Sequence, residues 1–200
     1  EQWCLPGEGP HVAVLDLGLK KNMLNCLQKR GCQLTVYPYD TPADVILASQ
    51  PDGIFLSNGP GDPKECGALL QTVSTLAESG VPLFAICLGH QLLALASGAD
   101  TKKMKYGHHG SNHPVKDLAA DRVYITAQNH GYEVIGDSFP EGTAQVTHQN
   151  VNDGSCEGVS YPGKPVFSVQ FHPEASGGPL DTDFIFDQFI GLMQKGDKNA

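Results

Sequence analysis

Short apolar runs alternate with segments of helical spacing through the first half of the chain. The runs predict strands buried on both faces of a sheet, and the spacing between them predicts amphipathic helices. Strands are expected at residues 11–17, 33–37, 53–56 and 81–86, and helices at residues 20–30, after Thr41-Pro42, at 65–79 and at 88–97. This alternation predicts a mostly parallel sheet flanked by helices.

Strands predominate in the second half, over residues 122–127, 133–135, 143–148, 157–160 and 166–170, before a last helix at 181–194. We therefore expect an α/β fold whose parallel sheet has an antiparallel extension in the second half. In such sheets, ligands bind beyond the carboxyl ends of the strands. Reactive residues are accordingly expected in the loops after Leu56, Ile86 and Gln170.

The length of 200 residues suits one domain, which we expect over residues 11–200. Residues 1–10 are rich in Gly and Pro and are expected to be a linker or the remnant of a missing N-terminal domain. The six cysteines include no C-x-x-C pair, and the first residues do not resemble a secretory signal. A reduced, cytoplasmic chain is therefore expected.

Charge and hydropathy argue against two classes of partner. The formal net charge of −9 repels phosphate backbones, so we expect no nucleic-acid partner. The apolar runs are far shorter than the ~20 residues of a membrane span, so no membrane partner is expected.

Cys87 stands where a predicted strand meets a predicted helix, in the stretch Ala85-Ile-Cys-Leu-Gly-His-Gln91. A sharp turn at such a junction presents a nucleophile above the sheet, and the amino end of the following helix stabilises a thiolate. A buried structural cysteine is the alternative, but the junction and Gly89 favour a nucleophile.

His172 and Glu174 follow the last predicted strand. Residues two apart in an extended chain project to the same side, and Pro173 favours an extended His172. Glu174 can then orient the imidazole of His172 and stabilise its cation, which suits a nucleophile–base–carboxylate relay.

Acyl transfer also needs hydrogen-bond donors for an oxyanion. The glycine-containing turn at residues 58–63 can supply a backbone amide, and the amide of Leu88 at the start of the helix can supply another. The turn has neither G-x-G-x-x-G nor a Walker lysine, so a phosphate site is disfavoured.

His108, His109 and His113 have spacings that a metal could use, but no acidic or cysteine residue lies near them in the sequence. We therefore expect a glycine-rich loop with surface imidazoles, and no metal site.

The C-x-G-x-Q motif of Cys87–Gln91 and the H-P-E motif of His172–Glu174 resemble the signatures of class I glutamine amidotransferases. Four stretches further resemble the small chains of carbamoyl-phosphate synthetases, and the resemblance extends from His11 to about Lys195. These stretches are residues 57–63, 105–115, 127–132 and 172–176.

The resemblance implies a flavodoxin-like fold and a catalytic triad of Cys87, His172 and Glu174. It also implies that the amides of Gly59 and Leu88 hold the oxyanion. Glutamine would be bound by Gly61, Gln91, Asn129, Gly131 and Tyr132. No cofactor is implied. Ammonia from L-glutamine would pass to the large chain of a carbamoyl-phosphate synthetase.

Two other functions stay open on the sequence. The chain could be a binding or regulatory module that docks on a synthetase without catalysing. It could instead keep the triad and act on another substrate, as a γ-glutamyl hydrolase or cysteine peptidase does. The stretch from Gln128 to Tyr132 favours free glutamine.

Overall fold

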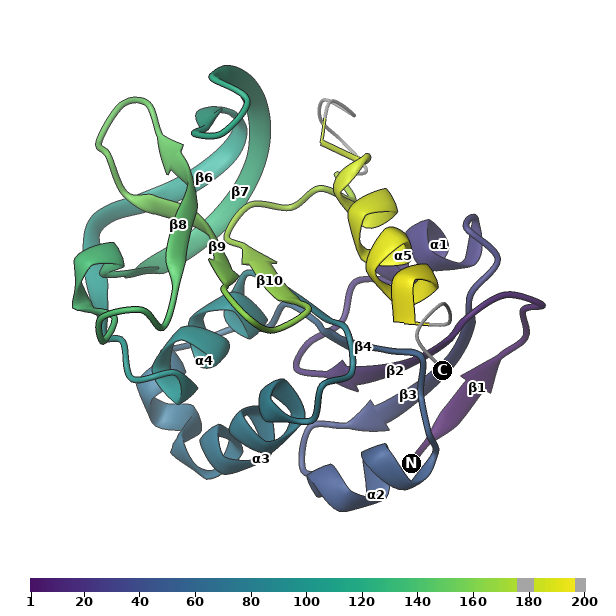
Figure 1. The fold of residues 1–200 in the computed structure, drawn as a ribbon. Helices are drawn as coiled ribbons and strands as arrows, with labels where there is room; N and C mark the ends of the chain where they lie inside the picture. Colours follow the sequence, from purple (N-terminus) through teal and green to yellow (C-terminus); the bar gives the residue numbers. More distant parts are fainter. Residues whose placement is uncertain (176–181, 197–200) are drawn as a thin grey trace.

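The computed structural model describes residues 1–175 and 182–196, and its described strands form a single mixed sheet (Figure 1). The strand order is β1-β3-β2-β4-β5-β10-β9-β8-β6-β7. The strands are β1 (Trp3–Leu5), β2 (His11–Asp16), β3 (Gln33–Pro38), β4 (Gly53–Leu56), β5 (Leu83–Ile86), β6 (Thr101–Asp117), β7 (Arg122–Val134), β8 (Gln145–Asn150), β9 (Cys156–Tyr161) and β10 (Val166–Val169).

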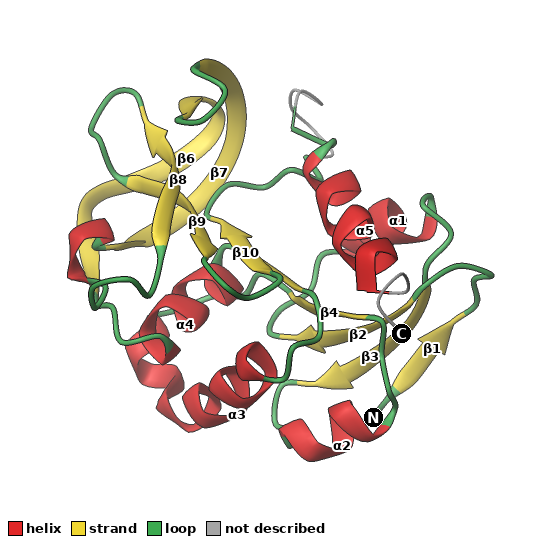
Figure 2. Cartoon of the chain, viewed as in Figure 1, coloured by secondary structure: helices red, strands yellow, loops and turns green. Residues whose placement is uncertain are grey.

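The strands β3, β2, β4, β5 and β10 pair in parallel, whereas β9, β8, β6 and β7 continue the sheet in antiparallel fashion. The α/β fold with an antiparallel extension is therefore confirmed (Figure 2). The helices are α1 (Lys21–Gln28), α2 (Ala43–Ala48), α3 (Gly67–Glu78), α4 (Leu88–Ala96) and α5 (Ile185–Gly196), with short 3-10 turns at Pro63–Cys66 and Gly136–Ser138.

Two separate cores form because successive strand residues point to opposite faces. On β2, Val12 and Val14 pack with apolar residues of α1 and α5, whereas Ala13 and Leu15 pack with those of α2, α3 and α4. The parallel part of the sheet is thus covered on both faces, which explains its continuous apolar strands.

The last helix is tied to the first by Arg30, which lies just beyond α1. Its guanidinium contacts Asp183 at 2.9 Å and Asp187 at 2.7 Å, and it lies 5.4 Å from the ring centroid of Phe186. The helix was expected from Asp181, a residue outside the described part of the chain.

The antiparallel half differs most from expectation. Residues 101–117 form one long strand, although a glycine-rich loop was expected around residues 108–113. The strands expected at 122–127 and 133–135 are one strand. The pairing of β6 with β7 shifts register between Lys103 and His108 and between Gly110 and His113. These irregularities break the two-residue alternation by which such a strand is recognised in sequence.

Residues 3–5 form the edge strand β1, although residues 1–10 were expected to be a linker. β1 pairs antiparallel with β3, with Cys4 opposite Thr35. Three of these ten residues thus extend the sheet, and the division of the chain after residue 10 stays a prediction. None of the described helices has the length and apolar character that crossing a bilayer requires.

Candidate active site

Cys87 occupies the turn between β5 and α4, and its backbone has φ 54° and ψ −105°. A non-glycine residue rarely adopts positive φ, and such strain often accompanies function. The Cys87 amide donates to the Val169 carbonyl at 3.0 Å, which ties the turn to the end of β10. A Cβ atom on Gly89 would lie 2.7 Å from the Leu56 carbonyl oxygen, so only glycine lets α4 approach β4 this closely. The predicted elbow is therefore present.

His172 and Glu174 lie just beyond β10, and both are buried. The His172 amide donates to the Ala127 carbonyl on β7 at 2.9 Å, and its Nδ1 lies 2.7 Å from Glu174 Oε1. The side chain of Asn22, at the start of α1, donates to the Glu174 carbonyl. Contacts with β7 and α1, together with the end of β10, therefore hold the imidazole of His172 and the carboxylate of Glu174 in place.

The imidazole of His172 also interacts with the Cys87 thiol. Burial opposes charge on His172, but its interactions with Cys87 and Glu174 outweigh burial and raise the pKa of His172 to about 9. Around neutral pH this imidazole carries a proton that it can give to a leaving group.

Gly59 and Leu88 pack together beside Cys87. A Cβ atom on Gly59 would lie 2.0 Å from the Leu17 carbonyl oxygen and 2.8 Å from Leu88 Cδ2. Leu88 is the first residue of α4, so its amide has no acceptor within the helix. The two expected oxyanion donors thus come from adjacent backbone segments. Gly61 follows in the same turn with φ +95°.

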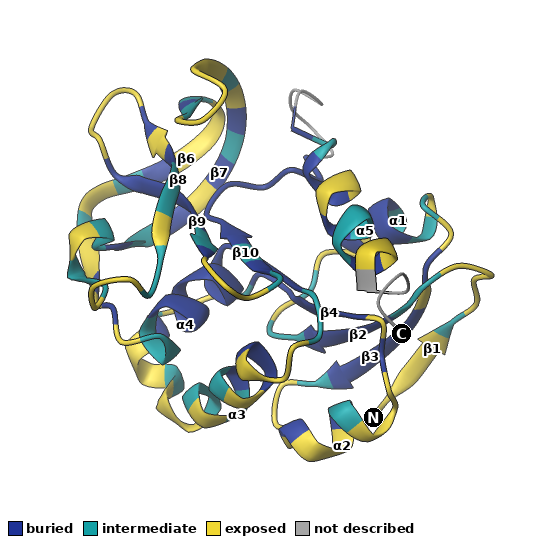
Figure 3. Ribbon diagram, in the orientation of Figure 1, coloured by how far each residue is buried: buried dark blue, intermediate teal, exposed yellow. Residues whose placement is uncertain are grey.

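Gln91 lies one turn of α4 beyond Cys87, and α4 is buried along most of its length (Figure 3). Its Nε2 donates to the Tyr132 carbonyl and to Gln170 Oε1, both at 2.9 Å. The expected binding residues Gln91 and Tyr132 are therefore in direct contact, with Gly131 preceding Tyr132 on β7.

Asn129 is exposed on β7, and its Oδ1 lies 2.9 Å from His109 Nδ1. It lines a cleft of about 590 Å³ together with His172 and Glu174. The cleft is completed by residues of α1 and of β6, among them Lys21 and Ser111. Cys87 and Gly59 do not line this cleft, which reaches the triad from the side of the imidazole.

Two residues at the site were missed in the sequence. Gln170 holds Gln91, and Asn22 holds the backbone of Glu174. Gln170 directly follows β10, and Asn22 lies at the start of α1, the helix after β2. Their position near the carboxyl ends of parallel strands was the signal available in the sequence. Polarity alone could not show which partners they meet.

The prediction of surface imidazoles is wrong for His108, although His109 is exposed. His108 is buried, with Nε2 2.7 Å from Asp153 Oδ2 and Nδ1 3.2 Å from Glu157 Oε1. The acidic partners are remote in sequence and come from the region of β8 and β9, which pairs alongside β6.

Residues 13–192 match the family described as "Glutamine amidotransferase class-I". The chain belongs to the class-I glutamine amidotransferase family. The match covers the parallel sheet, the elbow and the H-P-E segment, so the predicted family is confirmed.

Similar curated proteins include small chains of carbamoyl phosphate synthases. The chain is 54% identical over 202 residues to the carbamoyl phosphate synthase small chain of Pectobacterium atrosepticum, covering 96% of this chain and 53% of that one. It is 56% identical over 185 residues to the small chain of Photorhabdus laumondii, covering 92% and 48%. The chain therefore spans about half the length of the curated relatives it matches.

A solved structure from Thermoplasma acidophilum, described as one of the subunits of a GMP synthase, superposes with a TM-score of 0.82. It is 23% identical and covers 94% of this chain and 96% of its own. At this identity the likeness concerns the fold alone, and it agrees with the predicted α/β fold.

Proposed function

We propose that this chain is the glutamine-hydrolysing part of a carbamoyl-phosphate synthetase small chain. The observation that carries the proposal is the proximity of Cys87 to His172, whose Nδ1 lies 2.7 Å from Glu174 Oε1. The likeness to carbamoyl phosphate synthase small chains supports glutamine as the substrate.

In the first half-reaction, Cys87 Sγ attacks the carboxamide carbon of glutamine, and a C–S bond forms. The amides of Gly59 and Leu88 hold the oxygen that becomes negative. His172 gives its proton to the amide nitrogen as the C–N bond breaks. Ammonia leaves, and a γ-glutamyl thioester remains on Cys87.

In the second half-reaction, the neutral His172 takes a proton from water, and the hydroxide attacks the thioester carbon. The C–S bond breaks, glutamate leaves, and the thiolate of Cys87 is restored beside a protonated His172. Glu174 stabilises the cationic imidazole before the first half-reaction and after the second. This is the role of the third residue in such a triad.

Glutamine carries both an ammonium and a carboxylate, so several polar anchors must hold its head group. We assign this role to Gly61, Gln91, Asn129, Gly131 and Tyr132, which lie on the turn after β4, on α4 and on β7. Gln91 and Tyr132 are already joined by a hydrogen bond, which fixes their relative position before substrate binds.

We further propose that the ammonia passes to a large synthetase chain and that the enzyme works in the cytoplasm. The names of the relatives as small chains support a larger partner. All six cysteines are free thiols, which suits a reducing compartment.

The purified chain should release glutamate and ammonia in equal amounts from glutamine. A glutamine-mimicking electrophile should add one equivalent of mass on Cys87, and Cys87→Ala should lose both labelling and hydrolysis. Exposed Cys4 gives a matched control, since Cys4→Ala should change neither.

Labelling without hydrolysis, with or without the large chain, would favour the docking module instead. Faster hydrolysis of γ-glutamyl peptides than of glutamine would favour a hydrolase or peptidase. Adding the large chain and measuring carbamoyl phosphate tests the proposed destination of the ammonia.

A further inference from the structure

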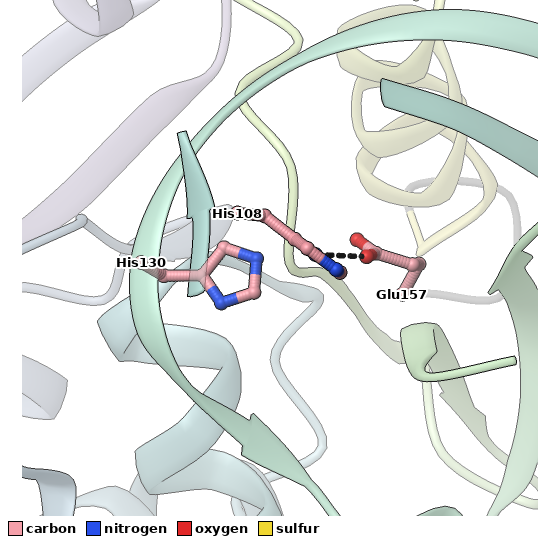
Figure 4. A group of neighbouring side chains, drawn as sticks. All are labelled: His108, His130 and Glu157. Atoms are coloured by element: carbon pink, nitrogen blue, oxygen red, sulfur yellow. Dashed lines mark ion pairs between the residues drawn. The ribbon is translucent and has the colours of Figure 1, made fainter. Parts of the chain in front are cut away.

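We propose that His108, His130 and Glu157 form a binding site for one divalent transition-metal ion of the zinc class. The three residues come from β6, β7 and β9, in the antiparallel half of the sheet (Figure 4). The site is separate from the triad, and the proposal does not depend on glutamine hydrolysis.

The inner atoms of the three side chains already converge. One ligand atom from each lies within 4.8 Å of the others, and His108 Nδ1 is 3.2 Å from Glu157 Oε1. Zinc holds its donors at ~2.0–2.2 Å in a tetrahedron, which separates them by roughly 3.4 Å. Small side-chain movements would therefore close the shell. All three residues are buried, and Glu157 is fully so.

The outer nitrogens of both histidines are held by acceptors. His108 Nε2 lies 2.7 Å from Asp153 Oδ2, and His130 Nδ1 lies 2.7 Å from the Tyr132 carbonyl oxygen. A carboxylate and a carbonyl both require a hydrogen on these nitrogens, so the inner nitrogens, His108 Nδ1 and His130 Nε2, face the interior of the cluster. Metal-binding histidines usually have this outer-shell arrangement. His108 Nδ1 lies 3.2 Å from Glu157 Oε1 and would give up its proton when an ion binds.

The interior of the cluster contains more acceptors than donors. Gln128 Oε1 lies 2.9 Å from His108 Nδ1, from which it can accept a hydrogen bond. It also lies 2.7 Å from His130 Nε2, where two lone pairs face each other when His130 Nδ1 carries the hydrogen. Glu157 Oε2 is buried without a hydrogen-bond partner in the described part of the chain. A bound cation satisfies these atoms together, and Gln128 offers a fourth ligand.

The donor set selects the class of ion. Two imidazoles with one carboxylate suit zinc and its neighbours, whereas calcium and magnesium prefer oxygen ligands alone. The ion would be bound by His130, which directly precedes Gly131. His130 also shares the Tyr132 carbonyl oxygen with Gln91 as a hydrogen-bond acceptor. The ion would therefore fix the strand that carries three proposed glutamine anchors.

The test uses the intact chain, stripped with a chelator and titrated with Co²⁺, whose spectrum reports its ligands. We expect one equivalent with a tetrahedral spectrum that lacks thiolate charge transfer. His108→Gln and Glu157→Gln should each weaken binding at least ~10-fold, and Asp153→Asn should weaken it about 10- to 100-fold. His109→Gln, the neighbouring but exposed histidine, should leave binding unchanged.

A failure to fold does not obscure the result, because the wild-type spectrum needs no variant and Asp153 is 44% exposed at its side chain. The proposal is overturned if stripped wild-type protein binds no equivalent of Co²⁺ or Zn²⁺. It is also overturned if the spectrum shows thiolate ligation, or if Asp153→Asn and Glu157→Gln bind as tightly as wild type.

Discussion

Glu174 Oε1 lies 2.7 Å from His172 Nδ1, and both side chains are buried beside Cys87. The carboxylate stabilises the imidazolium, so Glu174→Gln should lower the pKa of His172 from about 9 toward its ordinary value. The alkaline limb of the kcat profile for glutamine hydrolysis should then move to lower pH. We expect kcat to fall by ~10²-fold or more, since general acid–base catalysis contributes about that much.

A double mutant provides the control for this prediction. If Glu174 acts through His172, adding Glu174→Gln to His172→Gln should reduce kcat no further. Multiplicative losses in the double mutant would contradict a shared role. Retention of the wild-type alkaline limb in Glu174→Gln would contradict the electrostatic role directly.

His90 should make the fold sensitive to acid. It is fully buried on α4, with Nδ1 2.7 Å from Ser168 Oγ, and burial lowers the pKa of His90 to about 3. An unfolded histidine has a pKa of ~6.5, so the unfolded chain binds this proton first. The contribution of neutral His90 to stability is present above pH ~6.5 and is lost as pH falls toward 3.

The measurement is the free energy of unfolding at pH 7 and pH 4.5 for wild type and His90→Gln. Glutamine can still bond to Ser168 but does not titrate, so its loss of stability over this interval should be smaller by about 2–3 kcal/mol. Equal losses in the two proteins would show that His90 does not carry the effect.

Local pattern was enough to predict the turn that presents Cys87 between a strand and a helix. An apolar strand, one cysteine, a glycine and a helical segment follow one another within residues 83–96, and the H-P-E segment is equally local. Local pattern does not show that the two segments meet. Their meeting depends on the parallel pairing of β10 with β5, which places Val169 opposite Ile86. That pairing was inferred only through the general rule for strand ends.

The burial of His108 could not be predicted in the same way. Its strand is rich in Gly, Lys and His, and its two register shifts remove the alternation that marks a half-buried strand. Its partners Asp153 and Glu157 lie more than forty residues away in the sequence and reach it through the sheet order. The burial and the partners of His108 are therefore set by the pairing of strands that are remote in the sequence.

Gly59→Ala should damage catalysis through the backbone. The added methyl group would lie 2.0 Å from the Leu17 carbonyl oxygen, so the turn after β4 must move and take the Gly59 amide with it. Loss of one oxyanion donor costs ~10²–10³ in kcat. Gly67→Ala is a matched control, because its methyl group would meet nothing within 4 Å. Near-native kcat in Gly59→Ala would rule out this amide as a donor.

Gln170 should act as a positioning residue for glutamine. Its Oε1 accepts from Gln91 Nε2 at 2.9 Å, so Gln170→Met removes one of the two hydrogen bonds that hold the Gln91 side chain. We expect KM for glutamine to rise by ~5- to 10-fold with a smaller change in kcat, as for a lost hydrogen bond of about 1 kcal/mol. Steady-state kinetics measures this split. A fall in kcat at constant KM would instead place Gln170 in the chemical step.

The backbone of Cys87 should store measurable strain. At φ 54° and ψ −105° a residue with a Cβ atom is disfavoured, whereas glycine adopts this region readily. Cys87→Gly and Cys87→Ala both remove the thiol, so comparing them separates strain from chemistry. In regular structure glycine is less stable than alanine by ~0.5–1 kcal/mol. Here we expect the order to reverse, with Cys87→Gly more stable by ~1 kcal/mol in urea unfolding. If Cys87→Ala proves the more stable, the elbow is not strained, and its geometry costs the fold nothing.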